Sequence, residues 1–222
     1  MDSQLAQYVP VLMLALTAIA PAPHTPAPGD HDYAVTGIDS RKLGMWGFLA
    51  SECLFFGALI SSHLLYRARS PQGVKVPHDV YDIPYTSVSS FVLLMSSLTM
   101  VLALAAIQRG DHRRLRIWLL ATAFLGTVFV GGQVYEFTVF THHGVNLSSS
   151  VAASSFFVLT GFHGMHVTVG ILWLLSLVGI SLRGQLPAEK SLQVEIAGLY
   201  WHFVDVIWIL IFTVVYLVPN KH

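Results

Sequence analysis

The chain is poor in charge and has almost no cysteine, and both shortages narrow the class of protein it can be. Only 11% of its 222 residues are charged, whereas soluble domains carry about 25%. Hydrophobic residues make up 54%, and the mean hydropathy is +0.63. The formal net charge is zero, so there is no electrostatic basis for nucleic-acid binding. A single cysteine, Cys53, excludes an internal disulfide framework and any multi-cysteine metal site. The composition indicates an integral membrane protein, with eleven histidines as its unusual feature.

Long apolar stretches separated by polar segments define the expected architecture. A bilayer core of about 30 Å requires about 20 apolar residues in a helix. Five stretches qualify: Leu43–Tyr66, Thr86–Gln108, Ile117–Phe137, Val151–Leu182 and Ile196–Val218. The sequence therefore predicts an all-α integral membrane protein, a bundle of five transmembrane helices. Eight Lys and Arg residues fall on the side of the N-terminus against four on the other side, which predicts the N-terminus inside and the C-terminus outside.

The first forty residues have a different character. The run Tyr8–Ala20 is apolar but too short to cross a bilayer. It is followed by Pro21–Pro28, in which four prolines predict an extended linker. We expect the apolar run to lie at the membrane interface or against a partner subunit. The predicted domains are thus an N-terminal apolar segment with its Pro-rich linker, residues 1–40, and the transmembrane domain, residues 41–222.

Ionisable residues inside the predicted spans are the candidates for function, because burying them in hydrocarbon is costly. They are Glu52, Glu136, His163, His166, His202 and Asp205. His163 and His166 are three residues apart, as are His202 and Asp205, so each pair shares one helix face. Heights estimated from a rise of about 1.5 Å per residue place Glu52, His166, His202 and Asp205 at a similar level. We hypothesise that these four side chains meet, while the glutamate of the third span belongs to the outer end.

The residues alone leave three interpretations open. His and carboxylate side chains on facing helices can hold a metal, but the paired Glu-x-x-His motifs of di-iron bundles are absent. Buried Glu and His can instead relay a proton or ion, as they would in a small transporter with Glu52, His166, His202 and Asp205 as its path. The third interpretation is structural: the polar groups satisfy one another and fix helix register. It is the simplest for the histidine pairs and weaker for Glu52, which has no cation near it in the sequence.

Some residues near the span ends are candidates for contact with lipid. Arg113, Arg114 and Arg116 form a basic cluster, which is foremost a topology signal but also attracts anionic headgroups. Trp46 lies where an interfacial aromatic belt is expected. Together with His202, these are the predicted lipid-binding residues.

Four segments carry a resemblance to a known family. Ser154–Gly170 contains the run Gly-Phe-His-Gly-Met-His, and Tyr200–Trp208 reads Tyr-Trp-His-Phe-Val-Asp-Val-Ile-Trp. Ser51–Phe56 reads Ser-Glu-Cys-Leu-Phe-Phe, and Gly132–Phe137 contains Gln-x-x-Glu. These segments closely resemble motifs of subunit III of the haem–copper terminal oxidases, in that family's order and spacing. They lie on every span but the second, and the chain resembles the five-helix bacterial form of the family. The resemblance does not extend to residues 1–39.

The resemblance implies a non-redox accessory subunit of a proton-pumping oxidase that reduces dioxygen to water in the aerobic respiratory chain. It implies no catalytic residue and no metal site in this chain, with haem and copper in partner subunits. The partners would be oxidase subunits I and II and bound phospholipid, with a larger respiratory supercomplex as a further expectation. Cytochrome c is the expected donor; a quinol oxidase or a nitric-oxide-reductase-associated relative is the alternative. Glu52 matches a buried glutamate linked to proton handling and oxygen access. The expected location is the bacterial plasma membrane.

Overall fold

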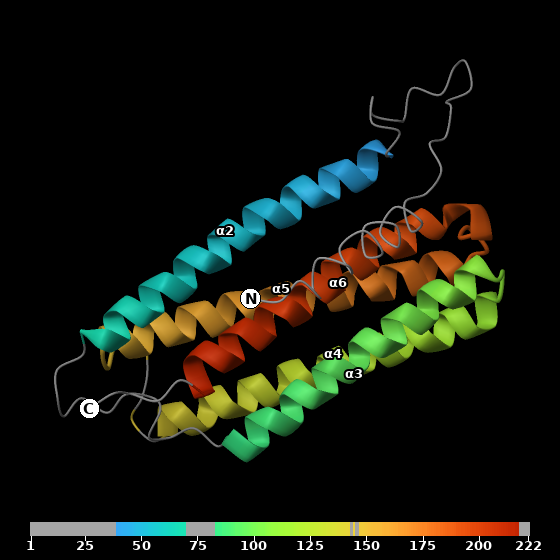
Figure 1. The fold of residues 1–222 in the computed structure, drawn as a ribbon. Helices are drawn as coiled ribbons and strands as arrows, with labels where there is room; N and C mark the ends of the chain where they lie inside the picture. The colour runs from blue at the N-terminus through green and yellow to red at the C-terminus, as the bar shows by residue number, and fades with distance from the viewer. Residues whose placement is uncertain (1–38, 70–82, 143, 145–146, 218–222) are drawn as a thin grey trace, which may run out of the picture. The chain divides into compact units, whose positions relative to one another are not determined.

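Long α-helices account for nearly all of the structure. The computed structural model describes residues 39–69, 83–142, 144 and 147–217. The helices are α2 (Ser40–Ala68), α3 (Ile83–Gln108), α4 (His112–His142), α5 (Val151–Leu182) and α6 (Ser191–Phe212) (Figure 1). A short 3-10 helix, Ala188–Lys190, precedes α6, and a π-helical turn, Thr213–Leu217, continues it. No β-strand occurs among the described residues.

The predicted fold class is confirmed. Five helices are long and apolar enough to cross a membrane, and four of them contain a predicted stretch in full. The fifth stretch, Ile196–Val218, runs past the end of α6 at Phe212 into the π-helical turn, and its last residue lies outside the described residues. The helices extend beyond the apolar runs, most clearly at α4, which begins at His112 rather than Ile117. Arginine is a good helix former, so the basic residues before Ile117 continue the helix instead of interrupting it. The predicted orientation of the termini stays a prediction.

The chain divides into two units, residues 1–46 and 47–222. Of the first unit the structure describes residues 39–46, which form the start of α2. The Arg41 amide donates a 2.8 Å hydrogen bond to Asp39 Oδ1, so Asp39 caps the helix in the usual way. The predicted apolar segment Tyr8–Ala20 and linker Pro21–Pro28 lie outside the described residues.

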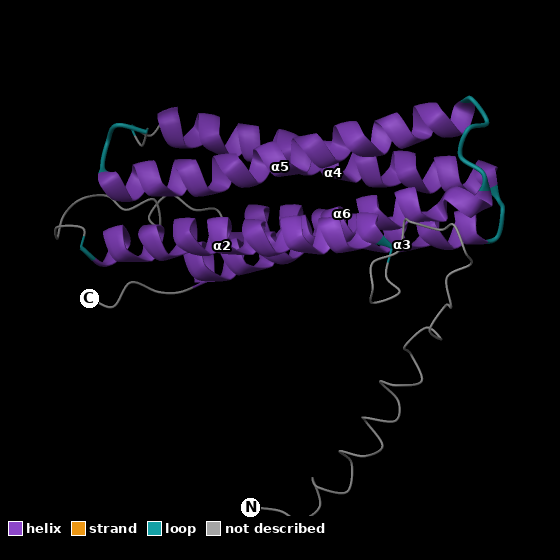
Figure 2. Cartoon of the chain, turned by 90° about the horizontal axis from the view of Figure 1, so that it is seen from above, coloured by secondary structure: helices purple, strands orange, loops and turns teal. Residues whose placement is uncertain are grey.

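Within residues 47–222, four helices pack in a closed cycle. α3 packs against α4 and α6, and α5 packs against the same two helices; Figure 2 shows the helices running side by side along their lengths. The tight turn between α3 and α4 contains Gly110 at a φ of +73°, a conformation that favours glycine. This cycle forms the core, and it positions the polar side chains described below.

The indole of Trp201 occupies the centre of that core. Its Nε1 donates a 2.9 Å hydrogen bond to Ser96 Oγ on α3. A Cβ atom built at Gly126 on α4 would lie 2.6 Å from the indole Cη2, and one built at Gly170 on α5 would lie 2.9 Å from Cζ3. Both positions therefore need glycine, because only a bare backbone leaves room for the ring.

The part of α2 that belongs to residues 47–222 is joined to α5 and α6 by polar contacts. His63 Nδ1 lies 3.0 Å from Ser155 Oγ on α5. Arg67 Nη1 donates to the carbonyl oxygens of Val214 and Val215, at 3.0 and 3.2 Å, in the π-helical turn after α6. These bonds satisfy carbonyl groups at a helix end that its own backbone leaves open.

Candidate functional site

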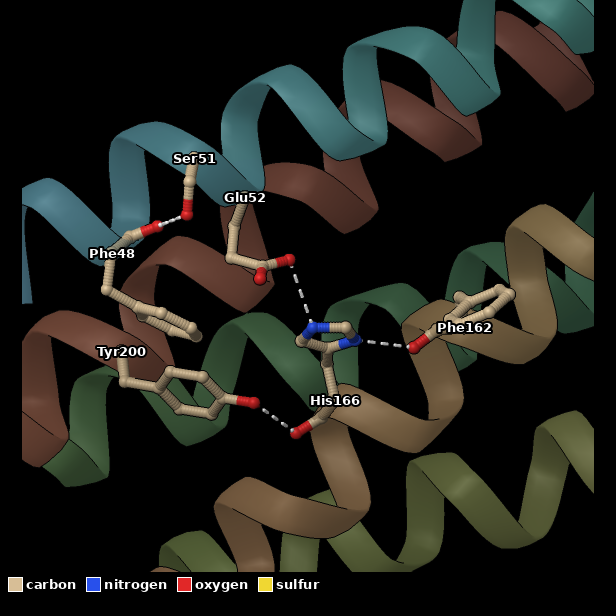
Figure 3. A network of polar contacts seen from close by, with 6 residues as sticks. All are labelled: Phe48, Ser51, Glu52, Phe162, His166 and Tyr200. Atoms are coloured by element: carbon tan, nitrogen blue, oxygen red, sulfur yellow. Dashed lines mark hydrogen bonds and ion pairs between the residues drawn. The ribbon is translucent and has the colours of Figure 1, made fainter.

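Glu52 on α2 and His166 on α5 face each other across the gap between their helices (Figure 3). Glu52 Oε2 lies 3.2 Å from His166 Nε2, the separation of an ion pair. The atoms do not have the alignment of a hydrogen bond, and Oε2 is buried without another partner. The side chains are 18% and 13% exposed, so water has little access to either group.

The second ring nitrogen determines what His166 can offer to Glu52. His166 Nδ1 lies 2.7 Å from the carbonyl oxygen of Phe162. A carbonyl only accepts, so Nδ1 carries a hydrogen. In a neutral ring, Nε2 then directs a lone pair at Glu52. The favourable states are a protonated Glu52 beside a neutral ring and a carboxylate beside an imidazolium, and both hold one proton between the two groups.

Aromatic rings surround the Glu52–His166 pair. The rings of Phe55 and Phe56 have their centroids 6.5 and 5.1 Å from that of His166. Tyr200 Oη donates a 3.0 Å hydrogen bond to the His166 carbonyl, and Phe48 stacks on Tyr200 at 6.4 Å. Figure 3 shows the rings of Phe48 and Tyr200 beside the pair. Because these rings are apolar, they strengthen the electrostatic interaction between Glu52 and His166.

A second polar cluster joins α3 and α6. Ser97 Oγ lies 2.7 Å from His202 Nδ1, and it also donates a hydrogen bond to Asp205 Oδ2. Asp205 is buried, and its Oδ1 has no partner among the described residues. A hydroxyl can accept one bond while donating another, so Ser97 links the two ionisable side chains.

The four residues expected to meet therefore lie in two pairs, each held by its own neighbours. Among the described residues, no hydrogen bond or ion pair joins Glu52 and His166 to His202 and Asp205. No group of three or more His, Cys, Asp or Glu side chains in the described part of the chain could hold a metal ion. The single meeting point stays a prediction: in the structure His166 contacts Glu52 on α2, whereas His202 and Asp205 contact Ser97 on α3.

His163 belongs to the packed core rather than to either pair. It is fully buried and stacks on Trp208 with ring centroids 5.0 Å apart, and Phe129 meets its edge at 5.9 Å. Neither ring nitrogen has a hydrogen-bond partner among the described residues. His163 and His166 both touch Phe56, so the predicted shared face is real, but only His166 reaches a carboxylate.

Glu136 lies near the C-terminal end of α4, apart from the other ionisable groups of the spans. It is buried, and Thr86 Oγ1 on α3 donates a 3.1 Å hydrogen bond to its Oε1. One turn earlier, Gln133 Nε2 donates to the Thr160 carbonyl at 2.6 Å. Its amide passes close to Gly164, where a Cβ would lie 2.5 Å from Gln133 Oε1. These contacts tie α4 to α3 and α5.

The basic cluster occupies the first turns of α4. Arg114 Nε lies 3.2 Å from Asp111 Oδ2 in an exposed ion pair, which contributes little to stability. Arg113 is exposed as well, and Arg116 is partly exposed. The positively charged side chains of this cluster are therefore accessible at the N-terminal end of α4.

The other two candidates for lipid contact are Trp46 and His202. Trp46 is exposed and belongs to the unit of residues 1–46. His202 lies in the middle of α6. The lipid-binding role of these residues stays a prediction.

Sequence reasoning did not identify Ser97, although this residue connects His202 to Asp205. The available signal was the pair Ser96–Ser97 in the middle of α3, directly after the apolar run Phe91–Met95. Each of these hydroxyls bonds a side chain of α6: Ser96 accepts from Trp201, and Ser97 contacts His202 and Asp205. Two adjacent serines deep in a span are thus a sign of an interhelical polar contact.

Comparison with known proteins identifies the family. A sequence model described as cytochrome c oxidase subunit III matches residues 22–219. The chain belongs to the cytochrome c oxidase subunit III family. A cytochrome c oxidase subunit 3 of Thermostichus vulcanus is 40% identical over 194 residues, covering 85% of this chain and 92% of the relative. A probable quinol oxidase subunit 3 of Staphylococcus saprophyticus is 39% identical over 179 residues, covering 80% and 89%. A cytochrome c oxidase subunit 3 of Bacillus sp. strain PS3 is 35% identical over 178 residues, covering 80% and 86%.

Membership of the subunit III family confirms the resemblance drawn from the four motifs. The chain is a subunit III of the haem–copper oxidases, a family whose members serve cytochrome c or quinol oxidases. A subunit III implies partner oxidase subunits. With five helices able to span a bilayer and bacterial relatives, it is a multi-pass membrane protein of bacterial type.

Proposed function

We propose that this subunit III is a non-redox accessory subunit of a proton-pumping haem–copper oxidase, with the haem and copper in partner subunits. It would pack beside subunits I and II and support the reduction of dioxygen to water. Family membership supports this proposal. The lack of a metal-holding cluster among the described residues is compatible with it.

The Glu52–His166 pair is the observation that carries the functional part of the proposal. In either favourable arrangement the pair holds one proton, on Glu52 or on His166, so the proton can move between the two side chains. The aromatic surroundings keep competing hydrogen-bond partners away. We propose that Glu52 supports proton uptake or oxygen access in the complex, and that it does not take part in electron transfer.

The variant Glu52→Gln tests this role in the intact oxidase. Glutamine keeps the size of the side chain but cannot exchange a proton with His166. We expect the initial rate of oxygen consumption to be largely retained, while proton uptake slows or activity declines earlier during sustained turnover. Oxygen electrode traces and proton-release measurements on reconstituted vesicles give the two readouts.

Glu136→Gln is the matched control for Glu52→Gln. Glu136 is also a buried carboxylate in a span, but its Oε1 accepts a hydrogen bond from a neutral hydroxyl, that of Thr86. The control should preserve both the rate and the durability of turnover. Complete loss of oxygen reduction in assembled Glu52→Gln complex would contradict an accessory role.

For the electron donor, we propose cytochrome c, with quinol as the second candidate. The relative from Thermostichus vulcanus, a cytochrome c oxidase subunit, matches 85% of this chain. Quinol oxidase subunits of Staphylococcus and Bacillus match this chain at similar identity, 39% and 40%, and this observation favours quinol as the second candidate. Oxygen consumption by the purified complex with reduced cytochrome c, compared with a quinol, distinguishes the two.

We further propose that the complex lies in the bacterial plasma membrane and that the α4 cluster of Arg113, Arg114 and Arg116 attracts anionic phospholipid. Basic residues next to a span bind such headgroups electrostatically. An independent transporter is less well supported, since the two polar pairs share no hydrogen bond or ion pair among the described residues. Proton flux through the purified chain alone in liposomes would favour that function instead.

A further inference from the structure

His202 lies halfway along α6, far from either membrane surface. From Ser191 to Phe212 the helix has 22 residues, and a rise of about 1.5 Å per residue places His202 about 15 Å from each end. The hydrocarbon core of a bilayer is about 30 Å thick. If α6 crosses the bilayer, the imidazole therefore sits close to the membrane midplane, where neither water nor lipid headgroups are available.

Only one nitrogen of His202 is used within the chain. Nδ1 contacts Ser97 Oγ, whereas Nε2 has no hydrogen bond to a described residue. His63 Nε2 and both nitrogens of His163 are fully buried without a partner, whereas His202 Nε2 is not fully buried. The side chain as a whole is partly exposed. His202 Nε2 is therefore not fully enclosed by the described residues.

The neighbouring contacts determine which hydrogen-bonding role Nε2 has. Ser97 Oγ donates its one hydrogen to Asp205 Oδ2. It must therefore accept from His202 Nδ1–H, and the Nε2 of a neutral ring carries a lone pair. A group that satisfies Nε2 has to be a hydrogen-bond donor.

The surface around Nε2 is otherwise apolar. We define the α3–α6 face as six side chains that are 41–54% exposed and lie within a few turns of Ser97 and His202: Leu94, Leu98 and Val101 on α3, and Val206, Ile209 and Leu210 on α6. Lipid chains could cover these residues, but they offer no donor to the imidazole. An unpaired polar group at this depth is costly.

Other lipid-facing surfaces of the bundle differ from the α3–α6 face in this respect. On α5, the exposed hydroxyls of Thr168 and Ser176 donate to carbonyl oxygens of their own helix, Gly164 and Trp173. Those groups need nothing from outside the chain. His202 Nε2, in contrast, needs a donor from outside the described residues. A transmembrane protein segment can bring a donor to the midplane of the bilayer.

We infer that the α3–α6 face docks a transmembrane helix of a partner oxidase subunit, which donates a hydrogen bond to His202 Nε2. The helix would present apolar side chains to the six residues and a donor such as Ser, Thr, Asn, Gln or Trp to the imidazole. This inference rests on the proposed role as a subunit of an oxidase complex. It adds which face of the chain makes contact and what chemistry the contact needs.

Photo-crosslinking in the intact complex tests the inference directly. A benzophenone amino acid at Val206 is compared with the same group at Leu172, an exposed position on α5 (63%). After irradiation in native membranes, mass spectrometry identifies the adducts. We expect Val206 to cross-link to a helix of another subunit that carries a donor at mid-depth, and Leu172 to give lipid adducts only. Val206 adducts with lipid alone, or with residues 1–38 of this chain, would overturn the inference.

A steric pair of variants provides a second readout that leaves Ser97 and His202 intact. Leu98→Trp enlarges the α3–α6 face, and Leu172→Trp makes the same change on α5. Both should insert into the membrane at the level of the unaltered chain. Leu98→Trp should be lost from the haem-bearing complex during washing in mild detergent, while Leu172→Trp should be retained. Equal retention would overturn the inference.

The outcome separates this inference from the function on which it rests. If the unaltered chain never co-purifies with haem-bearing subunits, the proposed function fails. If it does co-purify but cross-links through α5 instead of the α3–α6 face, the function stands and the inference fails.

Discussion

Single polar side chains decide how the helices of this subunit III meet, and Ser97 is the clearest case. One hydroxyl contacts both His202 and Asp205. Neither of these ionisable side chains has another hydrogen bond among the described residues. The pairing of α3 with α6 therefore depends on a residue that carries no charge.

The variant Ser97→Ala should destabilise the chain. Leaving buried polar groups without a partner costs about 1–3 kcal/mol in soluble proteins, while interhelical hydrogen bonds in membranes average about 0.6 kcal/mol. We expect the free energy of unfolding to fall by about 1 kcal/mol, which lies between the membrane average and the upper values for soluble proteins. Unfolding of the purified protein in mixed micelles with increasing SDS measures it.

Ser176→Ala is the control for Ser97→Ala. The Ser176 hydroxyl is exposed and donates to the carbonyl of Trp173 in its own helix, so its removal leaves no buried group unpaired. The unfolding midpoint should then stay near that of the unaltered protein. If both variants shift the midpoint equally, Ser97 has no special role in joining α3 to α6.

At the scale of the helices, close packing depends on a few glycines around Trp201. The indole lies between α4 and α5 and bonds Ser96 on α3, so one side chain of α6 contacts three other helices. At Gly170 a Cβ would lie 2.9 Å from the indole, so an added methyl group could be accommodated only if the ring or the helix backbone shifted.

Gly170→Ala should therefore destabilise the bundle by about 1–3 kcal/mol, the usual cost of overpacking a core. Gly179→Ala on the same helix is the control, since nothing lies within 4 Å of a Cβ built there. In a helix, alanine is favoured over glycine by up to about 1 kcal/mol, so the control should be neutral or stabilising. Thermal unfolding followed by circular dichroism compares them; a destabilised control would mean that helix α5, not the Trp201 contact, is sensitive.

The helices could be predicted from the sequence, but the pairing of their polar groups could not. The apolar runs identified all five spans because the length of a run reflects the thickness of a bilayer. Spacing also identified Glu52, His166, His202 and Asp205 as residues at similar depth. Depth says nothing about which neighbour a helix face meets, and this is why two separate pairs were expected to be one cluster.

The same limit explains the histidines that spacing could not tell apart. His163 and His166 share a motif and nearly a face, yet one stacks on Trp208 in the core and the other faces Glu52. The difference depends on the position of α2 and α6 around α5, which is a tertiary contact. The serine pair Ser96–Ser97 marks a polar contact in α3, but it does not say which residues of which helix receive it.

For the whole molecule, the central question is what an oxidase loses when this subunit is removed. The polar pairs lie between helices, and the described residues contain no cluster that could hold a metal. Our proposal, which rests on family membership, places the haem and copper in partner subunits. The subunit would act on the durability and proton supply of the reaction rather than on electron transfer itself.

Removing the chain from the assembled oxidase should leave the haem absorbance spectrum unchanged. The initial rate of oxygen reduction should also persist, and activity should then decay faster over successive turnovers than in the complete complex. Recording the spectrum and the oxygen consumption on the same depleted sample tests both expectations. Adding the purified chain back should restore durability, and adding back Glu52→Gln should restore less of it. Haem absorbance that fell in proportion to the chain removed would contradict the proposal, because the cofactor would then depend directly on this subunit.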